Sequence, residues 1–268
     1  MRAGHLLAVL ALLACLPSAA QNFQRYNGGV RDIALYNPAA AVNAGYRDAF
    51  FSRFNICSSD ESIERVFHFC DLSVEKVRHG VVVASVASSG YTWFGDRRLT
   101  AGYATGWGDK RSSFNIGATA SLDFNRVREN RKLYVLPDVT FGFEYCLGTF
   151  RVGASVVNAV SPAYLDFFRN PRAFVSHISA TWDKSSLTTV TPFAVCTYVG
   201  DVFSADLGLT ATWLDLISAT YVYRTDEIRS IIDAGVIVPV LPIEIHLGFS
   251  WSSVLPEKHI SFGLITRW

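Results

Sequence analysis

Two histidines near the C-terminus are the residues of this sequence that come nearest, by type and spacing, to a reactive site. His246 and His259 fall on the polar sides of two consecutive segments in which apolar and polar residues alternate, with Ser250, Ser261 and Glu244 nearby in sequence. A serine, a histidine and an acid on one surface could supply the nucleophile, base and orienting group of a hydrolase. His246 and Glu244, two residues apart on one face, could also contribute two metal ligands.

We favour a simpler interpretation, in which these residues are the ordinary polar lining of a folded wall. The sequence contains neither G-x-S-x-G nor H-E-x-x-H, and no third metal ligand is evident near His246 and Glu244. The other histidines beyond the first twenty residues are His68, His79 and His177. We therefore predict no catalytic residue, no cofactor and no metal-binding residue.

The elements that must position these residues are β-strands. From Phe114 to Phe124, the even-numbered residues are apolar and the odd-numbered ones are small or polar, and successive side chains of a strand point to opposite faces. The alternation recurs at 138–146, 203–213, 242–252 and 257–268. It is weaker near 50–56, 63–71, 79–88, 97–106, 149–158, 173–183, 188–198, 214–223 and 230–239. With 112–124 these segments predict an all-β fold, a single antiparallel transmembrane β-barrel of about 14 strands.

Composition favours a barrel in a membrane over a soluble β-sandwich. Charged residues make up 18% of the chain, below the roughly 25% of soluble domains, and the polar faces carry mainly glycine, serine and threonine. Aromatic residues gather at segment ends, as interfacial girdles require: Trp182, Trp213, Tyr221, Tyr223, Trp251 and Trp268. The 24 basic and 23 acidic residues nearly balance, which argues against a nucleic-acid partner.

Charged residues of both signs fall on the predicted inner faces: Asp123, Glu144, Arg151, Asp206, Arg224, Glu244 and Arg267. They could line an open pore or form salt bridges between strands, and the sequence leaves both possibilities open. Because both signs are present, no ion selectivity follows.

The N-terminal residues 1–20 are predicted to be a cleavable signal peptide. Arg2 precedes an apolar run from Leu6 to Leu16, and small residues precede a cut after Ala20. A lipoprotein signal ending at Cys15 is the alternative, but it leaves only a short apolar region. The predicted organisation is a signal peptide at 1–20, an N-terminal segment at the periplasmic mouth or in the lumen at 21–49, and an outer-membrane barrel at 50–268.

The sequence also predicts where the turns lie and leaves four cysteines in the mature chain. Gly95-Asp96, Gly108-Asp109 and Gly200-Asp201 predict turns. The prolines, among them Pro137 and Pro192, are expected near strand ends, where a missing N–H does least harm. The mature chain keeps Cys57, Cys70, Cys146 and Cys196, whose spacing fits no zinc motif and whose disulfide state the sequence leaves open.

Several segments resemble the PorP/SprF family of outer-membrane proteins, which belongs to the type IX secretion and gliding machinery of Bacteroidetes. Tyr36 to Ala49 resembles the N-terminal signature of that family, and 136–145 with 150–158 is similar to its mid-chain hairpin. Tyr221 to Asp226 and Lys258 to Leu264 resemble its last strands. The sequence departs from the family in its reduced second Asn-Pro, at residues 258 and 261, and in ending on tryptophan.

This resemblance implies a non-enzymatic barrel that assists the export or surface attachment of a large adhesin-like protein. It also implies contacts with periplasmic components of the secretion machine, besides the outer-membrane lipid. Docking of such partners on the segment around 37–47 is a further expectation. A passive porin-like channel is the alternative function, and a barrel hydrolase is a third.

Overall fold

The structure is a computed structural model. It describes residues 33–43, 49–58, 66–77, 79–90, 94–109, 111–127, 133–161, 163–165, 168–169, 171–185, 187–238, 243–254 and 258–267. The predicted signal peptide, and residues 21–32 and 44–48 of the predicted 21–49 segment, lie outside the described residues.

Fourteen principal strands account for most of the described chain. Their bounds are β1 (Ala49–Ser58), β2 (Val66–Val77), β3 (Gly80–Gly90), β4 (Phe94–Gly108), β5 (Ser112–Val127), β6 (Leu133–Leu147), β7 (Phe150–Val157), β10 (Ala173–Ala180), β12 (Thr188–Val199), β13 (Val202–Trp213), β14 (Ile217–Arg224), β15 (Arg229–Val238), β16 (Ile243–Ser252) and β17 (Lys258–Arg267). Each lies on one of the fourteen predicted segments. Three shorter strands are β8 (Ala163–Leu165), β9 (Phe168–Arg169) and β11 (Trp182–Ser185).

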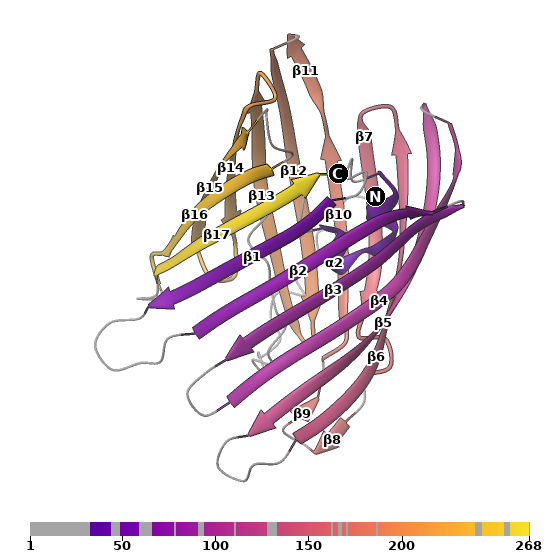
Figure 1. The fold of residues 1–268 in the computed structure, drawn as a ribbon, viewed down its shortest axis with the longest axis vertical. Helices are drawn as coiled ribbons and strands as arrows, with labels where there is room; N and C mark the ends of the chain where they lie inside the picture. Colours follow the sequence, from indigo (N-terminus) through magenta and orange to yellow (C-terminus); the bar gives the residue numbers. More distant parts are fainter. Residues whose placement is uncertain are drawn as a thin grey trace, which may run out of the picture.

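The principal strands are joined in one antiparallel order (Figure 1). Neighbours in sequence pair with each other, and β1 pairs with β17 from Ala49↔Arg267 to Ser58↔Lys258. β10 pairs with β7 on one side and with β12 on the other. Among the described residues the order of pairing therefore returns to its starting strand, and the predicted all-β barrel of about 14 strands is confirmed.

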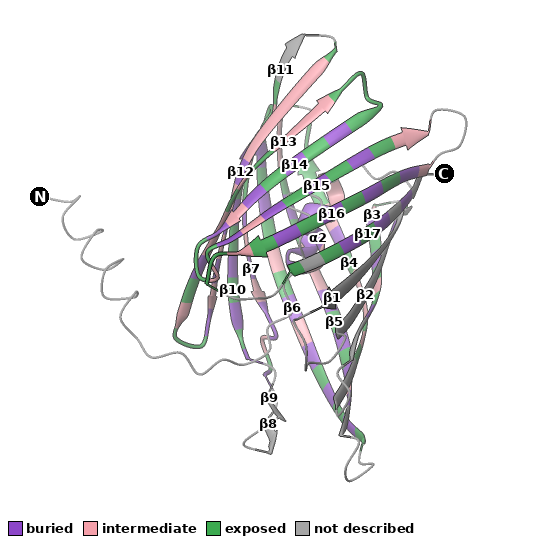
Figure 2. Cartoon of the chain, turned by 90° about the vertical axis from the view of Figure 1, so that its left-hand side faces the viewer, coloured by how far each residue is buried: buried purple, intermediate pink, exposed green. Residues whose placement is uncertain are grey.

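Buried and exposed residues alternate along the strands (Figure 2), and their types are inverted relative to a soluble protein. Phe141, Leu207 and Ile245 keep 53%, 49% and 39% of their surface exposed, whereas Glu144 and Glu244 are 1% exposed. Large apolar side chains point outward along most strands, and small or polar ones point inward. The outer surface therefore suits acyl chains and the inner surface suits polar groups.

Two prolines lie inside strands instead of near strand ends, which corrects the prediction for Pro137 and Pro192. Pro137 is in β6, where β6 pairs with β5 while its pairing with β7 covers only Phe141 to Leu147. Pro192 is in β12, between the last pair with β10 (Ser179↔Phe193) and the first pair with β11 (Trp182↔Val190). At both positions the strand lacks a regular ladder on one side, so the missing N–H is tolerated.

The turn predictions are confirmed at two of three positions. Gly108 (φ +124°) and Gly200 (φ +59°) adopt positive φ at the β4–β5 and β12–β13 turns, where glycine is favoured. Gly95-Asp96 is instead part of β4, paired with Arg126 and Asn125 of β5. The prediction was wrong there because the strand continues past the glycine.

Two short helical segments complete the described chain, α2 (Ile33–Tyr36) and η2 (Pro38–Asn43). α2 lies within the ring of strands (Figure 2), and η2 contacts β3, β4, β5 and β6. Among the described residues no helix has the length and apolarity to cross a membrane.

Candidate functional site

Residues 33–43, which we call the plug, occupy the lumen. Asn37 separates the two helical segments of the plug: its N–H donates to the Ile33 carbonyl oxygen at 2.7 Å, and its Oδ1 accepts from the Ala39 N–H at 3.1 Å. An asparagine cap followed by proline at the first helical position starts a helix efficiently. The Asn37-Pro38 pair thus ends α2 and begins η2.

Three glycines of the inner wall make room for the plug. Gly117 of β5 is paired with Gly142 of β6, and Gly153 of β7 lies close by. A Cβ atom at Gly117 would lie 2.7 Å from the backbone of the plug, and one at Gly142 would collide with Oδ1 of Asn37. At Gly153 it would lie 2.8 Å from Nδ2 of Asn37. We call these three residues the glycine socket, because only glycine lets the backbone of the plug approach so closely.

Asn37 is fully buried in this socket. Its Nδ2 donates to the carbonyl oxygen of Phe143 at 2.9 Å, so both ends of the side-chain amide are satisfied. Removing a buried hydrogen-bonding partner costs about 1–3 kcal/mol. The Asn37 side chain therefore fixes the position of the plug against β6.

Apolar contacts hold the plug against different parts of the wall. Ile33, Tyr36 and Ala40 are clustered with buried residues of β7, β10, β12, β14 and β15. Ala34 and Ala41 are clustered with buried residues of β2, β3 and β4. The plug therefore reaches two groups of strands on different parts of the ring.

The C-terminal end of the plug is attached through Asn43. Its Nδ2 lies 3.3 Å from Oγ of Ser113 and 3.2 Å from Sγ of Cys146. The Cys146 thiol in turn donates to Oε1 of Glu144 at 3.3 Å. Cys146 and Cys196 are both free thiols, while the side chains of Cys57 and Cys70 lie outside the described residues.

Glu144 and His177 form a buried pair that bridges over β7. Glu144 is directly opposite Gly153, and Gly153 is directly opposite His177. Because Gly153 has no side chain, Oε2 of Glu144 reaches Nε2 of His177 at 3.1 Å. Nδ2 of Asn115 lies 3.5 Å from Oε1 of Glu144, so this inward-facing polar group is packed next to the plug.

Several of the predicted inner-face charges form ion pairs between strands. Arg224 makes two 2.9 Å hydrogen bonds to Asp206, and Nη2 of Arg98 donates to Oδ2 of Asp123 at 2.8 Å. Asp123 and Arg224 are buried, and burial of a charge is tolerated when it is paired and hydrogen-bonded. At these four residues the salt-bridge alternative fits better than an open row of charges. Arg151 is only partly buried, and the side chain of Arg267 lies outside the described residues.

His246 lies between two carboxylates. Its Nδ1 lies 2.7 Å from Oδ1 of Asp233, and its Nε2 lies 2.9 Å from Oε1 of Glu244. Ser218 donates to Glu244 at 3.3 Å. Acids therefore lie within hydrogen-bonding distance of both ring nitrogens of His246.

The other serines and histidines named in the sequence analysis lie at several places on the barrel. Ser250 accepts a long hydrogen bond from Arg229 at 3.4 Å, Ser261 is buried on β17, and His79 is exposed in the β2–β3 turn. The side chains of His68 and His259 lie outside the described residues. Within the described part of the chain, no group of three or more histidine, cysteine, aspartate or glutamate residues is arranged to hold a metal.

Sequence reasoning missed the residues that organise the lumen. The glycine socket was visible only as glycines on the polar sides of neighbouring segments, and nothing marked them as contacts of Asn37. Asp233 was not singled out, although it alternates with apolar residues in β15. His177 was noted, but its pairing with Glu144 depends on the strand order.

The fold and its inverted burial define the class of outer-membrane β-barrels. Solved structures of this class resemble the chain over most of its length. Outer membrane protein Omp33 of Acinetobacter baumannii has a TM-score of 0.53 at 8% identity, covering 84% of this chain and 100% of its own. The CymD monoaromatic hydrocarbon channel has a TM-score of 0.58 at 10% identity and covers 91% and 94%.

The toluene transporter TbuX of Ralstonia pickettii has a TM-score of 0.56 at 8% identity, covering 92% of this chain and 96% of its own. No family model and no curated protein matches the sequence. The likeness therefore concerns the barrel fold.

Proposed function

We propose that this protein is an outer-membrane channel for small solutes and that displacement of its plug opens the passage. The observation that carries the proposal is the seating of the plug within the lumen, with Asn37 in the glycine socket and apolar contacts to two groups of strands. A wall that faces lipid outside and polar groups inside is the structure that a channel requires.

The inner wall favours water-soluble cargo. The names of two structural neighbours state monoaromatic hydrocarbons and toluene as cargo. Here the described inner surface carries buried side chains such as Asp123, Glu144, Arg224 and Glu244. Polar and charged groups of this kind stabilise hydrated solutes better than hydrocarbons. The proposal contains no bond-making step.

Conductance across planar lipid bilayers tests the proposal. We expect the wild-type protein to conduct rarely and in short openings, because the plug is hydrogen-bonded at both Asn37 and Asn43. Replacing both residues by alanine should raise the open fraction at least several-fold. Ser253→Ala, a polar truncation at an exposed loop position, is the matched control and should behave as wild type.

Two results would contradict the proposal. Steady, large conductance of the wild type that the double change leaves unaltered would identify a passive porin, in which the plug does not limit flow. Absence of conductance even after deletion of residues 33–43, in a protein that still shows β-barrel circular dichroism, would exclude a channel.

A component of a type IX secretion system is the second candidate function. Its support is the resemblance of Tyr36 to Ala49 to the PorP/SprF signature, in which Asn37 is the residue seated in the socket. In this function the sealed barrel is a scaffold that contacts a secreted adhesin-like protein and periplasmic components. Secretion and complex recovery should fall when residues 37–47 are deleted in the native host; unchanged levels of both would refute it.

Export through a cleavable signal peptide at residues 1–20 belongs to either function. Mass spectrometry of the protein purified from outer membranes should give a mature N-terminus at Gln21. A lipid-modified N-terminus at Cys15 would instead support the lipoprotein alternative.

A further inference from the structure

A furrow crosses the outer wall of the barrel over β7, β10, β12 and β13. Its floor is a row of small residues that the strand register places side by side: Ala154 opposite Ser176, and Ser176 opposite Cys196. All three alternate with inward-facing neighbours, so they belong to the outer surface. Small side chains next to one another on three adjacent strands leave a depression in a wall that is otherwise covered with large apolar groups.

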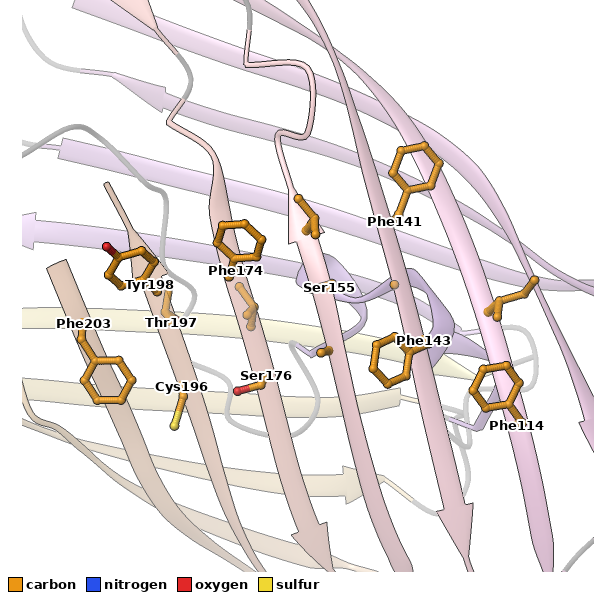
Figure 3. Close-up of a pocket in the computed structure, with 15 residues that line it drawn as sticks. Phe114, Phe141, Phe143, Ser155, Phe174, Ser176, Cys196, Thr197, Tyr198 and Phe203 are labelled. Carbon is orange, nitrogen blue, oxygen red and sulfur yellow. The ribbon is translucent and has the colours of Figure 1, made fainter. Parts of the chain in front are cut away.

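The borders of the furrow are aromatic (Figure 3). The next row of the same register contains Phe174, Tyr198 and Phe203, each paired with the one before. Phe114 and Phe143 are stacked with ring centroids 6.4 Å apart at the end of the floor row. The depression has a volume of about 720 Å³, within the roughly 300–1,000 Å³ range of ligand sites.

We propose that this furrow binds one acyl chain of an outer-membrane lipid as a specific site. The furrow is continuous with the lipid-facing surface, so hydrocarbon is the medium in contact with it. Among its fifteen lining residues none is Asp, Glu, Lys, Arg or His, and the few polar groups include Ser176 and Thr197. A lipid headgroup, a nucleotide or a peptide with charged side chains would find no partner there.

Shape distinguishes one chain from a protein partner. Strands are spaced by about 4.8 Å, so a floor that crosses three strands is roughly 10 Å long and one residue row wide. A narrow apolar depression of this form fits a flexible hydrocarbon chain, which gains dispersion contacts with the rings along one side and at the end of the floor. A second barrel would present a convex wall, which cannot enter it. The binding does not depend on whether the barrel conducts.

Native mass spectrometry of the full-length protein tests the site. The protein is extracted in mild detergent and supplied with phosphatidylethanolamine that carries a diazirine in its acyl tail. We expect a one-lipid adduct on the wild type and, after illumination, cross-links within the peptides that contain residues 150–157, 173–180 and 188–205. Ala154→Phe and Ser176→Phe each fill the floor, and each should lower adduct occupancy at least five-fold.

The matched control is Ala234→Phe, which adds the same ring to an exposed position on β15 and should leave the adduct unchanged. Equal occupancy in all variants, or cross-links spread evenly around the barrel, would overturn the proposal and indicate ordinary annular lipid. A dimer that disappears in the filled variants, with no lipid adduct, would overturn it in favour of a second copy of the chain. Heat-dependent mobility in gels confirms that each variant is folded.

Discussion

The side-chain amide of Asn37 donates to the carbonyl oxygen of Phe143 at 2.9 Å, which joins the plug to strand β6 across 106 positions of sequence. This contact exists because Gly142 precedes Phe143 and presents no side chain to the lumen. A mobile N-terminal segment loses conformational entropy when it is ordered in this way, so the buried hydrogen bonds and apolar contacts of the plug must offset that loss.

Substitution of Gly142 should unseat the plug without dismantling the barrel. The Cβ of Gly142→Val would collide with Oδ1 of Asn37, while valine itself is a good strand residue. We expect normal heat-dependent mobility of the barrel in gels but faster proteolysis between residues 33 and 43. Ser155→Ala is the control: it faces Gly142 across the ladder and its buried hydroxyl has no hydrogen-bond partner. If the valine variant were cut at the same rate as the wild type, the glycine socket would not be what holds the plug in place.

A disulfide between the plug and β6 should lock the lumen. Nδ2 of Asn43 lies 3.2 Å from Sγ of Cys146, so Asn43→Cys places two thiols close together. In a background with Cys57, Cys70 and Cys196 changed to serine, oxidation should abolish single-channel openings and reduction should restore them. The same background with Asn43 retained should be insensitive to redox conditions. Openings that persist after full oxidation would show that the plug does not control the passage.

Glu144 and His177 should contribute to stability as a unit. Their side chains meet at 3.1 Å in the buried lumen, and loss of one partner leaves the other without its hydrogen bond. Glu144→Gln and His177→Gln should each lower the free energy of unfolding by about 1–3 kcal/mol. The double variant should lose less than the sum of the two. Urea unfolding in lipid vesicles, followed by tryptophan fluorescence, measures all four proteins, and strict additivity would contradict a direct interaction.

The outward direction of Leu207 can be tested by placing a charge there. Leu207 lies near the middle of β13 and is 49% exposed. If it faces acyl chains near the bilayer midplane, Leu207→Arg should destabilise the folded protein in vesicles by about 2–4 kcal/mol. Leu207→Phe, which remains apolar, should cost far less. Equal effects of arginine and phenylalanine would place this residue in water.

Acid should weaken the turn between β4 and β5. Oδ1 of Asp109 accepts hydrogen bonds from the N–H groups of Ser112 and Arg111 at 2.9 and 2.8 Å, and these bonds lower the pKa of the carboxyl group. Because the folded pKa lies below the unfolded one, the stabilisation is present above the ordinary aspartate range and disappears as pH falls through the lowered value.

The melting-temperature difference between wild type and Asp109→Ala should therefore be largest at neutral pH. It should shrink as the solution is acidified below the ordinary aspartate range. Heat-dependent gel mobility across this pH range measures this melting-temperature difference. A difference that grows as the pH falls would refute the claim that the ionised Asp109 carboxylate stabilises the turn.

The sequence by itself determined the class of the fold. A side chain's direction in a strand depends only on whether its position is odd or even, so alternation over Phe114 to Phe124 predicted which residues face outward. The same local rule placed all fourteen strands, because each strand's pattern is contained within its own residues. The rules for prolines and turns were wrong at Pro137, Pro192 and Gly95, because the strand pairing at those positions decides whether the chain can remain in a strand.

Only the tertiary structure decided what fills the lumen. Asn37 meets Gly142 and Phe143, Glu144 meets His177 across Gly153, and His246 meets Asp233, because strand order and register bring distant segments together. The outer furrow arises in the same way, since its floor is a row of single small residues on three strands. Such contacts depend on pairing between strands, and no period within one segment encodes them.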